Sequence, residues 1–350
     1  LLLNLIINAD DLGYSARRDR AILRLLADGH VTDASFMVTG SACRSAELRS
    51  FFASRPTPGL HLNLTEGRPV CPPGQVPSLV NPDTGRFLGK LGFRAALSAG
   101  QVSRSDILAE AGAQFARFAE LFDGRPAGHA DGHQHAHSLP GLAASAFAEA
   151  AAAAGVHRVR VPAECRLPWL DVGDEDNNKT VETDGEAQSQ RRRFLTDVSN
   201  DAAIAAKQEF ASAGLTWPGA FMGLSSMGAE MRLDRVARQL ARQLSPALIK
   251  LRSMSDEPAE LWCEWMVHPG EPCLPGEPGC GGDPVDEFAC SSERRHEADF
   301  LASAEFAHFL MRPFDCEAFA AELPSDIAAS EAVRLRLSSF HDMPLVTQPL

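Results

Sequence analysis

The chain has 350 residues, of which 45% are hydrophobic and 23% are charged. These fractions are typical of a globular protein and exclude a fibrous or wholly disordered one. The formal net charge is −13 at pH 7, so the chain would repel a phosphate backbone, and we expect no nucleic-acid partner. The sequence contains neither an apolar run of 18 residues nor a signal-peptide pattern, so we expect no membrane partner and a cytoplasmic location.

Short apolar segments alternate with longer amphipathic segments along the chain. In chain order we expect strand 1–8, helix 16–28, strands 31–38 and 59–65, helix 103–122, a short strand before Asp131, helix 140–154, strand 156–161, helix 200–213, strand 220–224, helix 233–244, strand 261–268, helix 293–311 and strand 333–339. This alternation is typical of parallel β/α folds. We therefore predict an α/β fold with a single irregular (β/α) barrel over residues 1–350. An open doubly wound sheet is the alternative.

Two segments stand outside this pattern. Residues 171–193 are polar with almost no apolar side chains, which predicts a disordered insertion within the single domain. Cys273, Cys280 and Cys290 share a stretch rich in glycine and proline, where they could pair or bind a metal. The chain contains no CxxC spacing, so a zinc ribbon is not supported. The size of the chain and the even scatter of its cysteines favour free thiols.

Asp10 and Asp11 directly follow the first expected strand. Active sites of parallel β/α folds lie beyond the carboxyl ends of the strands. One of two adjacent carboxylates can ligate a metal while the other faces a substrate or a water molecule. The alternative is a polar turn or a helix N-cap.

Residues 129–137 read HADGHQHAH, so four histidines and one aspartate fall within nine residues. The members are His129, Asp131, His133, His135 and His137. Imidazole and carboxylate groups suit Zn, and also Fe, Ni or Co, by ligand type. We expect some of these side chains to orient ligands rather than to bind the metal. An exposed His-rich loop is the alternative.

Two further histidines fall in or at the ends of expected strands. His61 lies in the alternating segment 59–65, and His268 precedes Pro269 and Gly270. Read alone, His61 could be a buried structural histidine and His268 part of an ordinary turn. Taken together, the acidic pair, His61, the segment 129–137 and His268 predict a metal site with three ligands, one carboxylate and two histidines, and an open position. A carboxylate base and an imidazole acid beside such a site fit the hydrolysis of an amide or an ester.

These motifs resemble those of the YdjC-type carbohydrate deacetylases, especially the eukaryotic members. The matching segments are NADDLGYS at 8–15, GLHLNLTEGRP at 59–69, FLGKLGFR at 87–94, HADGHQHAH at 129–137, VRVPAE at 159–164, FMGLSSMG at 221–228, EWMVHPG at 264–270 and ERRHE at 293–297. They follow one order from one end of the chain to the other. The resemblance implies a barrel related to the NodB-type polysaccharide deacetylases. It also implies removal of N-acetyl groups from amino sugars or their oligosaccharides with a divalent metal ion, Mg or Zn.

The resemblance also implies a role for each site residue. Asp10 corresponds to the catalytic base, and His268 corresponds to the acid. The implied metal ligands are Asp11, His61 and His133. Arg160 resembles a residue that orients the substrate or a carboxylate. The remaining residues, which support the site or bind substrate, are His129, Asp131, His135 and His137.

A homodimer is a further expectation from the family.

Two other functions remain as alternatives to the carbohydrate deacetylase. One is a metal-dependent amidase or phosphoesterase that acts on a different substrate. The other is a sugar-binding protein that has lost catalysis, which the complete set of acid, base and ligand positions disfavours.

Overall fold

The computed structural model describes residues 1–170, 185–251, 260–283, 285–330 and 333–345. The strands are β1 (Leu2–Leu12), β2 (Asp33–Phe36), β3 (Gly59–Leu62), β4 (Ala130–Gly132), β5 (Ala220–Met222), β6 (Glu260–Val267) and β7 (Arg334–Leu337). The helices are α1 (Ala16–Ala27), α2 (Ala46–Phe52), α3 (Lys90–Ser98), α4 (Arg104–Leu121), α5 (Leu142–Ala153), α7 (Glu186–Ala205), α8 (Leu233–Leu251), α9 (Glu287–Cys290), α10 (Glu293–Leu301), α11 (Ala304–Met311), α12 (Glu317–Ala320) and α13 (Ser325–Ser330).

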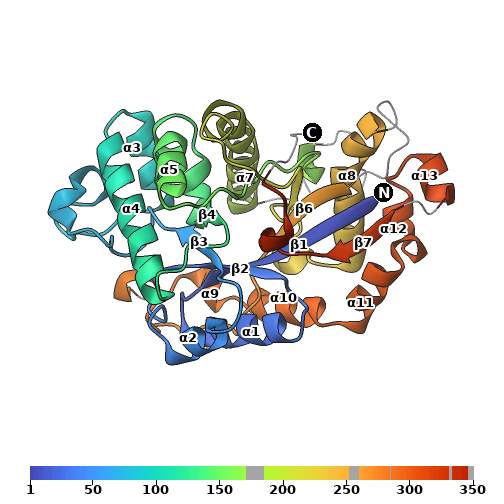
Figure 1. Cartoon of the computed structure of the whole chain (residues 1–350), viewed down its shortest axis with the longest axis horizontal. Helices are drawn as coiled ribbons and strands as arrows, with labels where there is room; N and C mark the ends of the chain where they lie inside the picture. Colours follow the sequence, from blue (N-terminus) through green and yellow to red (C-terminus); the bar gives the residue numbers. More distant parts are fainter. Residues whose placement is uncertain (171–184, 252–259, 284, 331–332, 346–350) are drawn as a thin grey trace.

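The strands form one parallel sheet in the order β4-β3-β2-β1-β6-β5, with β7 beside β1. Two isolated parallel bridges, Ala130 with Val159 and Arg158 with Thr216, continue the pairing from β4 toward the segment before β5. The sheet is therefore curled into an incomplete barrel, which confirms the predicted α/β fold. Figure 1 shows α3, α4 and α5 on one side of the strands and α8, α12 and α13 on the other.

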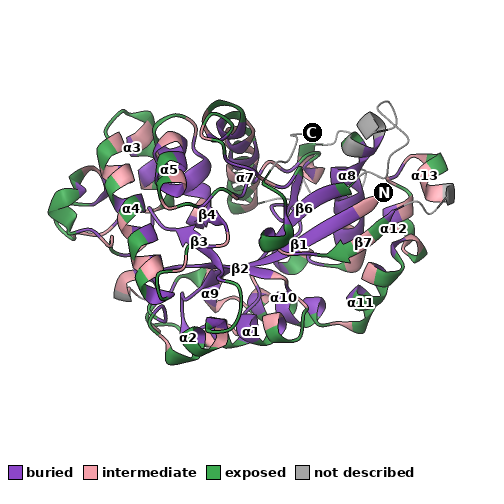
Figure 2. Ribbon diagram, viewed as in Figure 1, coloured by how far each residue is buried: buried purple, intermediate pink, exposed green. Residues whose placement is uncertain are grey.

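β1 lies at the centre of the sheet and is paired along both edges. β6 pairs with it over Leu2–Ala9, while β7 pairs with its first residues and β2 with its last residues on the opposite edge. A strand covered on both faces needs a continuous apolar sequence rather than an alternating one. This requirement explains the run Leu1 to Ile7, and β1 is accordingly buried along almost its whole length in Figure 2.

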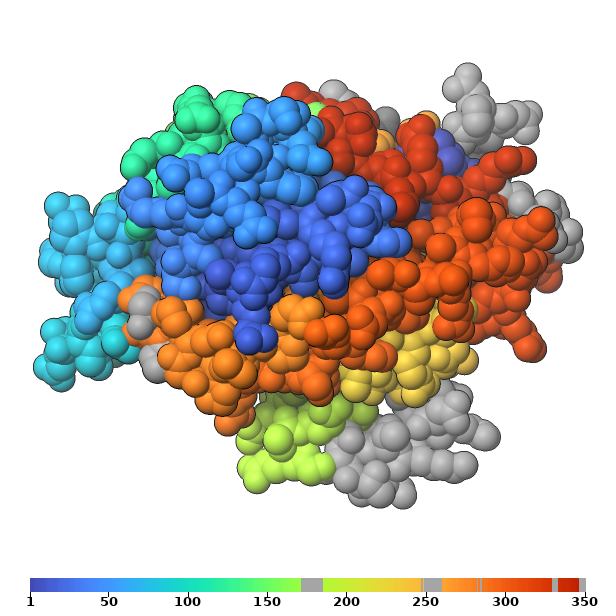
Figure 3. Space-filling view, turned by 90° about the horizontal axis from the view of Figure 1, so that it is seen from below, coloured from blue at the N-terminus to red at the C-terminus, as the bar shows by residue number. Residues whose placement is uncertain are grey.

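The helices at the two ends of the chain cover one common face. α1 packs against both α2 and α10. In Figure 3 this face carries blue atoms from the start of the chain beside orange and red atoms from its last part. Among the helices in the described ranges, none combines the length and the apolar character needed to cross a bilayer.

The end of β1 is irregular where the acidic pair lies. The register between β1 and β2 shifts between Ala9 and Leu12, and Asp11 adopts a positive φ of 65°. In a regular strand, adjacent side chains point to opposite faces. A bulge re-aims a side chain at such a point, so Asp10 and Asp11 can face the same group of residues. β1 ends at Leu12, whereas the predicted strand ends at residue 8.

Several predicted elements differ from the structure: β2 is shorter than predicted strand 31–38, α8 is longer than predicted helix 233–244, and three others differ in kind or in division. The expected strand 156–161 forms only the bridges at Arg158 and Val159. Helix 293–311 is divided into α10 and α11, because the Ser303 side chain accepts a hydrogen bond from the Phe306 N–H and caps a new helix. The expected helix 200–213 begins earlier, as α7, and continues into a π-helical turn at Ala206–Phe210.

The prediction of a disordered insertion is wrong for residues 186–193, which form the first turns of α7. Their straight-chain glutamine, glutamate and arginine side chains lose little rotamer freedom in a helix. The buried side chains of Leu195 and Val198 then anchor the same helix to the protein. Residues 171–184 lie outside the described residues. All eight cysteines fall within the described ranges and are free thiols, as predicted.

Gly13 allows the turn after β1 to pass close to β2. Its φ is +89°, and an added Cβ would lie 2.8 Å from a ring carbon of Phe36 and 3.0 Å from the Met37 carbonyl oxygen. We expect Gly13→Ala to lower the free energy of unfolding by about 1–3 kcal/mol in urea titrations. Gly74, which has open space around it, is the control, and Gly74→Ala should change stability by less than about 0.5 kcal/mol. Equal effects at both positions would contradict this account of the turn.

Candidate active site

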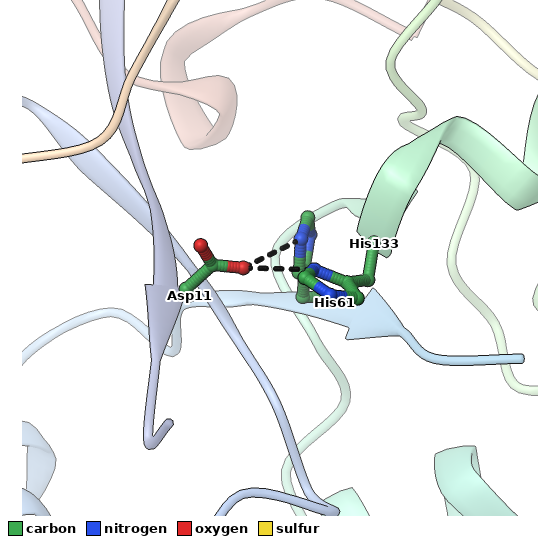
Figure 4. Close-up of side chains that lie close together, drawn as sticks. All are labelled: Asp11, His61 and His133. Atoms are coloured by element: carbon green, nitrogen blue, oxygen red, sulfur yellow. Dashed lines mark hydrogen bonds and ion pairs between the residues drawn. The ribbon is translucent and has the colours of Figure 1, made fainter. Parts of the chain in front are cut away.

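Asp11, His61 and His133 converge at the carboxyl ends of β1, β3 and β4: Asp11 and His61 lie in the last residues of β1 and β3, and His133 directly follows β4. The Asp11 Oδ1 atom lies 3.2 Å from His61 Nε2 and 3.0 Å from His133 Nδ1, as Figure 4 shows. All three residues are buried. One carboxylate oxygen thus faces two imidazole nitrogens that come from distant parts of the chain.

Each of the two imidazoles is held by a second carboxylate at its other nitrogen. His61 Nδ1 lies 2.7 Å from Asp131 Oδ1, and His133 Nε2 lies 2.9 Å from Glu66 Oε2. A carboxylate in this position fixes the ring orientation and tautomer of a metal-binding histidine. The contacts therefore aim His61 Nε2 and His133 Nδ1 at the same point.

The electrostatic field at this point favours a cation. Burial opposes a charge on His61, but Asp131 and Asp10 raise the pKa of the imidazole to about 9. Burial likewise opposes a charge on His133, but Asp11 and Glu66 raise its pKa to about 10. An excess of negative charge that holds imidazoles in their cationic form would also stabilise a bound metal ion.

The residues present fit a divalent metal ion. Asp11, His61 and His133 offer one carboxylate oxygen and two imidazole nitrogens within 4.8 Å of one another. The other Asp11 oxygen, Oδ2, lies 2.9 Å from the Arg18 guanidinium, so a single oxygen is directed at the histidines. Three protein ligands and an open position are the pattern of a catalytic metal site.

A second acidic group, Asp10 with His61 and Asp131, also has suitable spacing. However, the Arg160 guanidinium lies 2.6 Å from Asp10 Oδ1 and 3.0 Å from Asp131 Oδ2. A fixed positive charge between these carboxylates opposes a metal ion there. Asp11, His61 and His133 are therefore the better candidate ligands.

Arg160 binds Asp10 through two parallel hydrogen bonds. Nη1 and Nη2 each donate over 2.6 Å to one oxygen of Asp10, and Nε donates over 2.7 Å to Glu264 Oε1. Asn8 donates a further hydrogen bond to Asp10 over 2.8 Å. Burial raises the pKa of Asp10 above its ordinary value although Arg160 acts in the opposite direction. The result is a tightly oriented carboxylate next to the candidate metal ligands.

His268 reaches the site from the end of β6. Its Nε2 lies 3.8 Å from Asp10 Oδ2, and its ring packs edge-on against Phe288 at a centroid distance of 5.2 Å. Burial lowers the pKa of His268 well below its usual range, and Arg294 and Arg18 add to this effect although Asp11 opposes it. The imidazole is therefore neutral before a substrate binds.

The other histidines of segment 129–137 lie outside the convergent group. His129 stacks on Phe340 at 3.9 Å between ring centroids, and His137 Nε2 lies 3.1 Å from the Arg160 carbonyl oxygen. The rings of His129 and His137 are buried, and burial lowers their pKa values to about 3 and about 4. His135 is also buried and has a positive φ of 59°. They pack around the site, and their role as supporting or substrate-binding residues stays a prediction.

The structure adds residues that the sequence analysis did not single out. Glu66 binds His133 and also accepts a hydrogen bond over 2.8 Å from the Tyr14 hydroxyl. Arg18 binds Asp11, and Glu264 binds Arg160. Each lies within or just after a segment that carries the family resemblance. Their location in or near these segments is the sequence feature that could have pointed to these residues. The sequence itself does not show that a charged side chain is buried.

Comparison with known proteins identifies the family. Residues 4–312 match the family described as YdjC-like protein. The chain belongs to the YdjC-like protein family. A carbohydrate deacetylase of Mus musculus is 42% identical over 305 residues, which cover 85% of this chain and 88% of that protein. A carbohydrate deacetylase of Homo sapiens is 41% identical, with 86% of this chain and 85% of that protein covered.

More distant relatives extend the family similarity to bacteria. A chitooligosaccharide deacetylase of Serratia marcescens is 40% identical over 149 residues, or 42% of this chain and 56% of that protein. The crystal structure of an Enterococcus faecalis protein named for cellobiose-phosphate cleavage has a TM-score of 0.57 and 18% sequence identity. The alignment covers 97% of this chain and 98% of the Enterococcus faecalis chain. At 18% sequence identity, this similarity supports the fold alone.

Glu66 provides a test of how His133 is oriented. We expect Glu66→Ala to weaken the affinity for a divalent metal by about 10–100-fold, because His133 loses the carboxylate that fixes its ring. Equilibrium dialysis against Zn or Mg measures this affinity directly. Glu47, which is exposed in the first turn of α2, is the control, and Glu47→Ala should bind metal normally. Unchanged affinity in Glu66→Ala would show that His133 needs no such support.

Proposed function

We propose that the chain is a carbohydrate deacetylase that hydrolyses the N-acetyl group of an amino sugar with the help of a divalent metal ion. The observation that carries this proposal is the convergence of Asp11 Oδ1, His61 Nε2 and His133 Nδ1 beside the oriented carboxylate of Asp10. The similarity to carbohydrate deacetylases over most of the chain supports the same activity. The acidic net charge suits a neutral acetylated sugar.

Asp11, His61 and His133 would hold the metal ion. Such an ion polarises a carbonyl group and makes water a better nucleophile at neutral pH. Two imidazoles with one carboxylate favour Zn over Mg by ligand type. Metal analysis of the purified protein tests this preference.

Asp10 is the proposed general base. The two hydrogen bonds from Arg160 and the one from Asn8 fix the carboxylate, so it can receive the proton of the attacking water without reorienting. His268 is the proposed acid for the leaving amine, because its Nε2 lies 3.8 Å from Asp10 Oδ2. Its imidazole is neutral before a substrate binds, so it must first take up a proton, and the proton that Asp10 removes from the attacking water supplies it. Amide hydrolysis uses a base for the attacking water and an acid for the leaving amine.

The predictions of a homodimer and of a cytoplasmic location concern properties of the protein in solution and in the cell. They stay predictions. Size measurement in solution tests the first, and imaging of the tagged full-length protein tests the second.

Asp10→Asn tests the role of the base. We expect kcat for acetate release from N-acetylglucosamine oligomers to fall by about 10²–10⁴-fold, while the bound metal stays near the level of the unaltered protein. An enzymatic acetate assay and metal analysis of the same sample give both values. Substantial remaining turnover would exclude Asp10 as the base.

His133→Ala tests the ligand assignment. We expect this variant to lose both metal and acetate release, since one of three protein ligands is removed. His308 is exposed and forms a surface pair with Asp315, so His308→Ala is the control and should keep both properties. Normal metal content together with full turnover in His133→Ala would refute the assignment.

A further inference from the structure

The proposed acid, His268, is oriented differently from the two candidate metal-binding histidines. The rings of His61 and His133 are each held by a carboxylate. Within the described ranges, no group forms a hydrogen bond with His268 Nδ1, and Nε2 lies 3.8 Å from Asp10 Oδ2, which is beyond hydrogen-bonding distance. The position of this ring must therefore be set by the backbone that carries it and by the groups packed against it.

The backbone of His268 lies just beyond the last paired residue of its strand. β6 ends at Val267, which pairs with Ala9 of β1. The N–H and C=O groups of His268 therefore need partners outside the sheet. The next residue, Pro269, has no N–H group. Without other contacts this strand end would be free to move, and the imidazole would move with it.

Two residues of α10 provide the missing partners. The His268 N–H donates to Glu297 Oε2 over 2.6 Å, and Arg294 Nη1 donates to the His268 carbonyl oxygen over 2.9 Å. The Gly270 N–H donates to the backbone carbonyl of Arg294 over 3.0 Å. Because Arg294 and Glu297 are three residues apart, they lie on one face of the helix, where they form an ion pair over 3.1 Å. The segment from His268 to Gly270 is thus fixed at three backbone groups.

Phe288 connects the same ion pair to the imidazole ring. The Phe288 ring packs edge-on against His268 at a centroid distance of 5.2 Å. The guanidinium carbon of Arg294 lies 3.8 Å from the Phe288 centroid, and a cation over an aromatic face is a favourable contact. Arg294 therefore restrains His268 both at its carbonyl oxygen and through the neighbouring ring.

Glu297 also joins the ends of two strands. Its second oxygen, Oε1, accepts a hydrogen bond over 2.7 Å from the Gly228 N–H in the loop after β5. Arg294 and Glu297 are both completely buried. A buried ion pair contributes little net stability, because the cost of desolvation offsets the attraction between the charges. The main effect of the pair is therefore geometric: it fixes the backbone around His268.

We propose that Arg294 and Glu297 are positioning residues that hold the imidazole of His268 where it can protonate the leaving amine. The proposal rests on the proposed deacetylase function and assigns a role in it to helix α10, which contains none of the candidate metal ligands. Both residues act through His268 rather than on the substrate. Their replacement should therefore affect only those substrates that need the acid.

Two substrates with different leaving groups test this role. An oligomer of N-acetylglucosamine releases an amine, which must be protonated as it leaves. 4-Nitrophenyl acetate releases a phenolate that is stable without a proton, although the same water attacks the same acetyl group. A displaced His268 should therefore slow hydrolysis of the amide and leave hydrolysis of the ester unchanged. A general loss of structure would slow both reactions.

Glu297→Gln keeps the shape of the side chain but has one oxygen instead of two, so either His268 or Gly228 loses its acceptor. We expect kcat for acetate release from the oligomer to fall about 10–100-fold, while KM and ester hydrolysis stay within about threefold and the bound metal is unchanged. Asp299 is exposed on the same helix, so Asp299→Asn is the control and should match the unaltered protein. An equal loss on both substrates, or no loss on either, would overturn the proposal.

Arg294→Lys covers the case in which Glu297→Gln does not fold. Lysine keeps the positive charge but lacks the planar fork of the guanidinium, so we expect the same selective loss, of about tenfold. Arg295 is exposed on α10, and Arg295→Lys is the matched control. A residue that acts through His268 has no further effect once the imidazole is absent. An additional loss of more than about threefold when Arg294→Lys is added to His268→Ala would therefore contradict the proposed role.

The positioning role and the deacetylase function fail in different ways. Acetate release by the unaltered protein, combined with equal rates in Glu297→Gln, would refute the positioning role and keep the function. If the unaltered protein releases no acetate, the function is refuted, and the imidazole NMR signal of His268, assigned by its loss in His268→Ala, decides the positioning role. A shift of this signal in Glu297→Gln but not in Asp299→Asn supports the role, and an unchanged signal refutes it.

Discussion

The rest of the site depends on the ion pairs that the buried guanidinium of Arg160 forms with the carboxylates around it. Its side chain is fully buried and binds three carboxylates, those of Asp10, Asp131 and Glu264. These carboxylates belong to β1, β4 and β6, so one guanidinium connects three strands of the sheet. A buried charge is tolerated when it is paired, and removal of one partner leaves the others uncompensated. Asp131 in turn orients His61, and therefore both the proposed base and one candidate metal ligand depend on the same cation.

Backbone irregularity is the second determinant of the site. The bulge at the end of β1 places Asp10 and Asp11 near one group of histidines, and Asp11 adopts a left-handed conformation there. Gln134 and His135, directly after His133, also have positive φ values. Non-glycine residues in this region cost about 1–3 kcal/mol each and persist where the surrounding structure holds them. The burial and ion pairs around Asp11 and His133 provide that restraint, so the convergence of ligands is maintained against local strain.

Much of this arrangement could be predicted from the sequence, because the strands alternate with helices and the polar motifs fall at strand ends. The order of the parallel strands explains why Asp11, His61 and His133 meet although they are far apart along the chain. Burial of charge could not be predicted, since nothing in the local pattern distinguishes Arg18 or Glu66 from an exposed polar residue. The hydrogen-bonded pairing of strands was also hard to predict. Residues 156–161 alternate like a strand, yet within this segment only Arg158 and Val159 form β-bridges. Residues 186–193 have the polar composition of a disordered segment. They are helical because the following turns of α7 are anchored in the core.

The central position of β1 has a consequence for how the chain is made. Leu2 pairs with Glu260 on one edge and with Arg334 on the other. The ribosome makes β1 long before it makes β6 or β7, and at roughly 5–20 residues per second the delay is on the order of 10–60 s. During translation β1 must therefore remain without these two partners. β1 therefore gains its full set of hydrogen-bonded neighbours only after β6 and β7 have been made.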